Sequence, residues 1–159
     1  MVNSRLKGNR GERKVIEFFR NWWGGNWERR SMGYEGSDLI VPDNFPFAVE
    51  VKDNEQLLAR HFFHPTKLFK DMWQQAKIQA FDQGKAPLLV VNVEKKWYII
   101  APLSMSMSDS GSVLTRRLNG DSVEIMTVDD FMLAFEDANP GLFKAKPKLV
   151  ETKRAKKTA

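Results

Sequence analysis

The chain has 159 residues, of which 42% are hydrophobic and 28% are charged, so it can bury one good core but is too short for two domains of typical size. It contains no cysteine, which excludes disulfide bonds and thiolate metal sites and leaves oxygen ligands and two histidines for a metal ion. No apolar run reaches the length of a membrane-spanning helix, and the N-terminal residues do not form a signal-peptide core. We therefore expect a soluble, intracellular protein, in the cytoplasm or in the cytoplasm of a host, with no membrane partner.

The formal net charge of +5 is concentrated at the C-terminus. Residues 144–159 hold seven basic residues and one acid, which leaves 18 basic and 19 acidic residues in the rest of the chain. We expect a single domain over residues 1–143, with a core at about 5–103 and a C-terminal strand and helix at 113–138. The basic tail at 144–159 is either a flexible, solubilising end or a segment that contacts phosphates without sequence preference.

The first half of the chain predicts a helix followed by three strands. Apolar residues recur at helical spacing from Gly8 to Gly24, which predicts an amphipathic helix. Three short strand candidates follow, at residues 26–31, 37–41 and 47–51. The last two are joined by a turn, so we expect an antiparallel meander.

The second half predicts a helix, a strand pair and a short strand and helix. Thr66 can cap a long helix that ends at about Gln83. The later elements are strands at 88–93, 97–101 and 122–126, a loop at 104–112, and a helix that is capped by Thr127 and stopped at 139–141. The core order is α-β-β-β-α-β-β, which predicts an α/β fold.

The tripeptide Glu50-Val51-Lys52 is the most informative part of the sequence. Residues two apart on a strand point to the same face, so Glu50 and Lys52 emerge side by side. An isolated pair of this kind is usually an ion pair on an exposed strand. Asp38 lies at the start of the preceding strand, where a hairpin brings its carboxylate near Glu50. Two carboxylates repel each other unless a cation lies between them, which favours a Mg²⁺ site.

Glu12 is the third candidate acid. It lies three residues before Val15 and seven before Phe19, on the apolar face of the predicted first helix. A favourable interaction of a glutamate with the helix N-terminus is the alternative explanation. Together with Asp38, Glu50 and Lys52, a role in binding metal or positioning water is the better interpretation.

Four segments of the chain follow one known pattern: Lys7-Gly8-Asn9-Arg10-Gly11-Glu12-Arg13, Arg30-Ser31-Met32-Gly33, Asp38-Leu39 and Glu50-Val51-Lys52. An apolar run at 86–91 and an aromatic-rich strand at 97–100 follow them. Together these segments resemble the PD-(D/E)-x-K nuclease superfamily, and within it the archaeal-type Holliday junction resolvases. The resemblance spans about Arg5 to Leu103.

The resemblance implies a restriction-endonuclease-like core with a central mixed β-sheet flanked by helices. It also implies a homodimer that hydrolyses phosphodiester bonds in four-way or otherwise branched DNA, with Mg²⁺ as cofactor and Mn²⁺ as its substitute. Lys52 is the implied catalytic lysine. The implied metal ligands are Glu12, Asp38, Glu50 and the backbone carbonyl of Val51. The implied or candidate DNA contacts are Arg10, Arg13, Arg30, Ser31, Lys67 and Lys70. Gln75, in the second helix, is a candidate polar helper beside the metal.

Several alternatives remain open at this point. Ser37 stands where the superfamily has its name-giving proline, although the resolvase branch often lacks that residue too. A nuclease of the same fold with another target, of the restriction type or a phage DNA-degrading enzyme, is the main rival, and a non-catalytic DNA-binding module is the second. His61 and His64 could share a zinc ion on a helix, but Pro65 favours a loop there, with DNA backbone contact or plain exposure.

Overall fold

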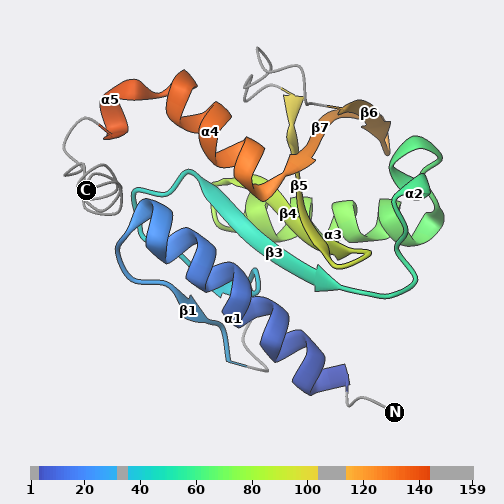
Figure 1. Cartoon of the computed structure of the whole chain (residues 1–159), viewed down its shortest axis with the longest axis horizontal. Helices are drawn as coiled ribbons and strands as arrows, with labels where there is room; N and C mark the ends of the chain where they lie inside the picture. The colour runs from blue at the N-terminus through green and yellow to red at the C-terminus, as the bar shows by residue number, and fades with distance from the viewer. Residues whose placement is uncertain (1–3, 32–35, 104–113, 144–159) are drawn as a thin grey trace, which may run out of the picture.

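The computed structural model describes residues 4–31, 36–103 and 114–143 of the chain. The predicted loop at 104–112 and the basic tail at 144–159 therefore lie outside the described residues. Figure 1 shows a sheet with helices on both faces, which confirms the predicted α/β class. Within the described part of the chain, no helix is long and apolar enough to cross a membrane.

The central sheet has five strands in the order β3-β4-β5-β7-β6. Their bounds are Phe47–Asp53 for β3, Ala86–Val93 for β4, Lys96–Pro102 for β5, Leu114–Leu118 for β6 and Asp121–Thr127 for β7. β3 pairs with β4 in parallel, and the other three pairings are antiparallel. The sheet is therefore mixed, as the sequence predicted.

One face of the sheet is covered by α1 (Ser4–Trp23) and α4 (Val128–Ala138), and the other by α3 (Lys67–Asp82). The apolar stripe of α1, which includes Val15 and Phe19, packs with Phe131 of α4 against the first face. Phe69 and Trp73 of α3 pack against the second face. Thr66 and Thr127 cap α3 and α4 through their side chains, as predicted.

The predicted antiparallel meander is confirmed for its first pairing and wrong for its second. β1 (Glu28–Arg29) and β2 (Leu39–Ile40) form a separate two-stranded antiparallel sheet, and β3 belongs to the central sheet. The reason is that residues Phe47 to Val51 of β3 are all buried, so this strand needs a helix layer on each face. The crossover through α3 then places β4 beside β3 in parallel.

Four further elements differ from the predicted ones. A short helix, α2 (Arg60–Phe63), lies in the segment predicted as a loop, and β6 was not predicted. A one-turn helix, α5 (Pro140–Phe143), follows the predicted stop, with proline at a first helical position where it loses no hydrogen bond. The first helix begins at Ser4 instead of Gly8.

Candidate active site

The edge strand β3 presents Glu50 and Lys52 on one face of the sheet. Their register partners on β4, Leu89 and Val91, belong to the core beneath α3, so both side chains point to that face. Glu50 is 2% exposed, and its Oε1 lies 3.4 Å from Nζ of Lys52. The predicted side-by-side placement of this acid and this lysine is confirmed.

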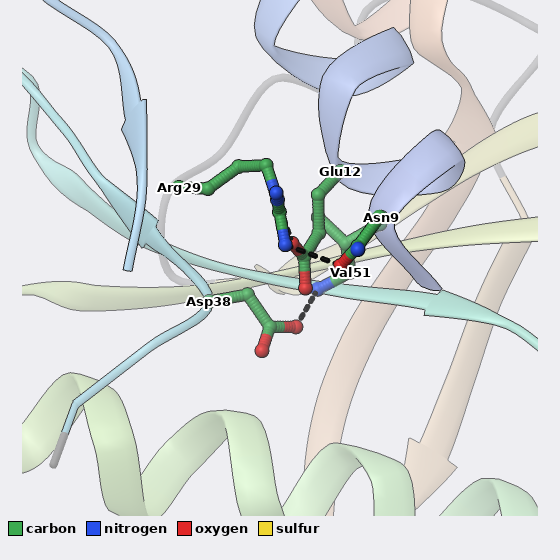
Figure 2. Close-up of polar contacts among 5 residues, drawn as sticks. All are labelled: Asn9, Glu12, Arg29, Asp38 and Val51. Carbon is green, nitrogen blue, oxygen red and sulfur yellow. Dashed lines mark hydrogen bonds and ion pairs between the residues drawn. The ribbon is translucent and has the colours of Figure 1, made fainter. Parts of the chain in front are cut away.

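Asp38 approaches β3 at its free edge. Its Oδ2 accepts a hydrogen bond of 2.8 Å from the backbone N–H of Val51 (Figure 2). The neighbourhood of Asp38 and Glu50 that the sequence predicted is therefore present, although a side-chain hydrogen bond creates it instead of a β2–β3 hairpin. The bond also fixes the Asp38 carboxylate between the two residues of the Glu-x-Lys pair.

The protonation of Glu50 reflects this crowding. The pKa of Glu50 is raised to about 7, because burial and the negative charge of Asp38 raise it by more than Lys52 lowers it. The second carboxylate oxygen of Glu50, Oε2, is buried and has no hydrogen-bond partner among the described residues. A buried carboxylate with an unpaired oxygen beside a second carboxylate is an arrangement that a bound cation stabilises.

A divalent metal ion fits this pair of acids. Mg²⁺ is held by one or two carboxylates together with waters and substrate phosphates, so Asp38, Glu50 and the carbonyl of Val51 are a sufficient protein contribution. Among the residues that the structure describes, no three acidic or histidine side chains converge as a metal cage. Glu12 is therefore not part of a compact ligand cluster in this arrangement.

Glu12 is instead bound by an arginine that the sequence-based site did not include. Nε of Arg29 donates a hydrogen bond of 2.6 Å to Oε2 of Glu12, and the Arg29 guanidinium also donates to Oδ1 of Asn9. Figure 2 shows Glu12 and Asn9, both of α1, meeting the Arg29 side chain, which comes from β1. The ion pair joins the first helix to the β1–β2 sheet beside Asp38.

Arg30 supports the segment that carries Asp38. Its Nε donates to the carbonyl of Ser37 at 2.7 Å, and its backbone N–H donates to the carbonyl of Asp38 at 2.8 Å. Gly36 adopts a φ of 129°, and a Cβ there would lie 2.7 Å from Nε of Arg30. Glycine is thus required at this position for the guanidinium to reach the backbone. The predicted contact of Arg30 with DNA phosphates stays a prediction.

Ser37 connects the site to α3. Its side chain is fully buried, donates to the carbonyl of Leu39 and accepts a hydrogen bond of 2.8 Å from Nε2 of Gln83. Gln83 is the C-terminal cap of α3. The predicted polar helper, Gln75, is exposed on the same helix. The α3 glutamine that contacts Ser37, the neighbour of Asp38, is therefore Gln83, and no local sequence pattern singles it out.

The remaining candidates lie on the surface. The exposed residues are Arg10, Arg13, Ser31, His64, Lys67 and Lys70. Lys67 forms an exposed ion pair of 2.7 Å with Asp71. His61 accepts a hydrogen bond of 3.0 Å at Nδ1 from the backbone N–H of Leu58, which occupies a nitrogen that a shared metal ion could have used.

A mixed sheet with Asp38, Glu50 and Lys52 at its edge strand is the arrangement that the motif resemblance predicted. A family model described as "Phage putative PDDEXK endonuclease" matches residues 3–135 of the chain. The chain therefore belongs to this family of PD-(D/E)XK endonucleases, and its α/β fold is of the restriction-endonuclease-like type. The predicted superfamily and the nuclease class are confirmed.

The chain was also compared with solved structures and with curated proteins. Among solved structures, Hjc of Archaeoglobus fulgidus, a Holliday junction resolvase from an archaeal hyperthermophile, is similar over 80% of this chain and 88% of its own, with 17% sequence identity and a TM-score of 0.41. A search of curated proteins gave no match.

Proposed function

We propose that this chain is a divalent-metal-dependent DNA endonuclease whose active site is formed by Asp38, Glu50 and Lys52. One observation carries the proposal: Glu50 is buried beside Asp38, with one carboxylate oxygen unpaired and the other 3.4 Å from the Lys52 ammonium. Holding two acids together in this way costs stability in the metal-free protein. Binding of a catalytic cation by the two acids explains why the protein keeps this destabilising arrangement.

The roles of the residues follow from their positions. Asp38, Glu50 and the Val51 carbonyl would hold Mg²⁺, or Mn²⁺ in its place. When bound there, the ion would supply positive charge next to the scissile phosphate and make a neighbouring water more acidic. Lys52 neutralises the negative charge that develops on the phosphate and orients the attacking water. The Glu12 carboxylate helps to position the metal or its bound water, either while it stays paired with Arg29 or after that ion pair breaks.

We further propose branched DNA as the substrate, cut by a soluble intracellular homodimer. The support is the motif resemblance to archaeal-type Holliday junction resolvases, and a two-fold dimer explains paired cuts in a four-way junction. Cleavage leaves a 5′-phosphate and a 3′-hydroxyl on the cut strand. The proposed DNA contacts are Arg10, Arg13, Arg30, Ser31, Lys67 and Lys70, and Gln75 is the proposed polar helper beside the metal.

A second substrate has support from the family itself. The matching family is described as a phage endonuclease, which supports the alternative of a phage DNA-degrading enzyme. The active-site chemistry is the same in both cases, because the protein residues act on the phosphodiester and not on the bases.

Cleavage of matched DNA substrates tests the proposal. A synthetic four-way junction, a Y-fork, a linear duplex and a single strand of the same sequence are incubated with Mg²⁺, with Mn²⁺ and with EDTA, and the products are mapped on a denaturing gel. The wild type is compared with Glu50→Gln and with Glu17→Gln, which alters an exposed glutamate of α1. We expect cleavage by the wild type and by Glu17→Gln, and none with EDTA or Glu50→Gln.

The pattern of cuts separates the candidates. Paired symmetric cuts in the junction alone support a resolvase, whereas equal cutting of linear duplex supports the phage DNA-processing function. Tight binding without cleavage of any substrate contradicts the nuclease proposal and leaves a non-catalytic DNA-binding module.

A further inference from the structure

A basic surface with an exposed aromatic ring lies where α2 meets β6. We call it the α2–β6 surface, and it consists of Arg60, Phe63, His64, Lys67, Lys70 and Arg116. Phe63 is 55% exposed, although its neighbour Phe62 is buried. The guanidinium carbon of Arg116 lies 5.2 Å from the centroid of the Phe63 ring. An arginine and a phenylalanine from segments far apart in the sequence thus form one outward-facing stack.

The stack is held on a rigid base. Phe62 packs against Phe69 of α3 and Tyr98 of β5, with ring centroids 5.6 Å and 5.1 Å apart. Since α2 is anchored by Phe62, the adjacent Phe63 is directed outward. On the β6 side, Nδ2 of Asn119 in the β6–β7 turn donates to the backbone carbonyl of Lys70. These contacts fix both partners of the Phe63–Arg116 stack before any ligand binds.

The charge of this surface is positive. It carries Arg60, Lys67, Lys70 and Arg116, and Asp71 pairs with Lys67. Among the described residues, Arg60, Lys70 and Arg116 form no ion pair. Cations without acidic partners around an exposed ring are complementary to a nucleic-acid strand, whose phosphates bind the cations and whose bases stack on the ring.

The surface lies on the same face of the sheet as the proposed catalytic lysine. Lys52 of β3 is opposite Val91 of β4, and Val91 is opposite Tyr98 of β5, on which Phe62 packs. Neighbouring strands are about 5 Å apart, so Tyr98 is displaced from Lys52 by only about 10 Å across the sheet. A DNA strand held at Lys52 can therefore extend over α2 toward β6.

We propose that the α2–β6 surface binds a single-stranded part of the DNA substrate, with one unpaired base stacked on Phe63 and the adjoining phosphates bound by the surrounding cations. The inference rests on the proposed nuclease function and specifies its substrate as DNA that contains unpaired bases. Bases inside a duplex are already stacked on each other, so a protein ring can reach only an unpaired or displaced base.

Binding to labelled DNA in EDTA tests this proposal without catalysis. The single strand and its duplex are titrated with wild type, Phe63→Ala and Phe63→Trp, and with Phe81→Ala as the matched control. Phe81 is 85% exposed on α3, outside the α2–β6 surface. We expect Phe63→Ala to bind the single strand about tenfold more weakly and the duplex unchanged, since one base–aromatic stack contributes on this scale. Phe63→Trp should restore binding, and Phe81→Ala should match the wild type.

Three outcomes overturn the proposal. The first is unchanged single-strand affinity in Phe63→Ala, the second is an equal loss for duplex and single strand, and the third is an equal loss in Phe81→Ala. Thermal unfolding of each variant excludes a folding defect. The binding result is independent of cleavage, so a wild type that binds through Phe63 but cuts no DNA refutes only the nuclease function. A wild type that cuts DNA with no effect of Phe63→Ala refutes only the stacking surface.

Discussion

Arg29 Nε lies 2.6 Å from Glu12 Oε2, and the two side chains are 29% and 18% exposed. The pair links β1 to α1, so its loss leaves a poorly solvated carboxylate without its cation. We predict that Arg29→Ala lowers the free energy of unfolding by about 1–2 kcal/mol, a value between those of exposed and fully buried pairs. Urea denaturation at neutral pH measures this change.

The matched control for Arg29→Ala is Lys67→Ala. Lys67 and Asp71 are 2.7 Å apart, but their side chains are 90% and 61% exposed. Water screens such a pair, so Lys67→Ala should change the free energy of unfolding by less than Arg29→Ala does. Equal effects of the two substitutions would show that the burial of the Glu12–Arg29 pair has no energetic importance.

Metal binding should be visible as a change in stability. Burial and the charge of Asp38 disfavour the ionised form of Glu50, and a cation removes that penalty. We predict that saturating Mg²⁺ or Mn²⁺ raises the melting temperature of the wild type by about 2–5 °C, since a ligand that binds only the folded state stabilises it. Differential scanning fluorimetry with added metal or EDTA measures the shift.

The variants Glu50→Gln and Asp38→Asn distinguish this site from weaker metal binding elsewhere. Both should lose the metal-dependent shift, while Glu17→Gln keeps it. In EDTA, Glu50→Gln should be as stable as the wild type or more so, because the neutral amide removes a buried charge next to Asp38. A full metal shift in Glu50→Gln would place the ion somewhere else.

Asp121 gives the protein a predicted stability loss in acid. Hydrogen bonding from Lys77, whose Nζ lies 2.5 Å from Asp121 Oδ2, lowers the pKa of this aspartate below its ordinary value of 3.8, and the indole N–H of Trp73 adds to the effect. An aspartate whose pKa is lowered by folding stabilises the folded state at pH values above its pKa in the unfolded chain. This contribution disappears as the pH falls through the pKa of the folded state. Asp121→Asn should therefore be less stable than the wild type at neutral pH, and the difference should shrink below about pH 4.

Urea midpoints measured from about pH 6 down to about pH 3 test this dependence. Asp82→Asn, which removes an exposed carboxylate of α3, is the charge-matched control. Its midpoints should follow those of the wild type more closely at every pH. A constant difference between Asp121→Asn and the wild type over the whole range would contradict the linkage.

The placement of Glu50, Lys52 and Asp38, the proposed catalytic residues, was predictable because it is local. Strand alternation alone puts Glu50 and Lys52 on one face, and chain order puts Asp38 within reach. The partner of β3 was not predictable in the same way. The choice between β2 and β4 depends on the two helix layers that bury β3, and short strand patterns do not encode that arrangement.

Arg29 and Gln83 were not predicted as part of the site because each acts through a long-range side-chain hydrogen bond. Arg29 lies 17 residues from Glu12, and Gln83 lies 46 residues from Ser37, so no helical or strand period relates the partners. The strand β6 is a different case. Residues 114, 116 and 118 share one face of the strand, but the middle one is an arginine, so the sequence shows no apolar alternation that identifies the strand.

The hydrogen bond between Ser37 and Gln83 gives a last prediction, on how α3 supports Asp38. Ser37 is fully buried, so removal of either partner leaves a polar group without its bond. We predict that Ser37→Ala and Gln83→Ala each lower the free energy of unfolding by about 1 kcal/mol, and that a double-mutant cycle gives a coupling energy of about 0.5–1.5 kcal/mol. Gln74→Ala, which alters an exposed glutamine of the same helix, should couple to Ser37→Ala by less than about 0.3 kcal/mol. Because Ser37 precedes Asp38 directly, both single variants should also weaken the metal-dependent thermal shift, whereas Gln74→Ala should leave it intact. A Ser37–Gln83 coupling near zero, with the metal shift unchanged, would mean that the end of α3 does not help to position Asp38.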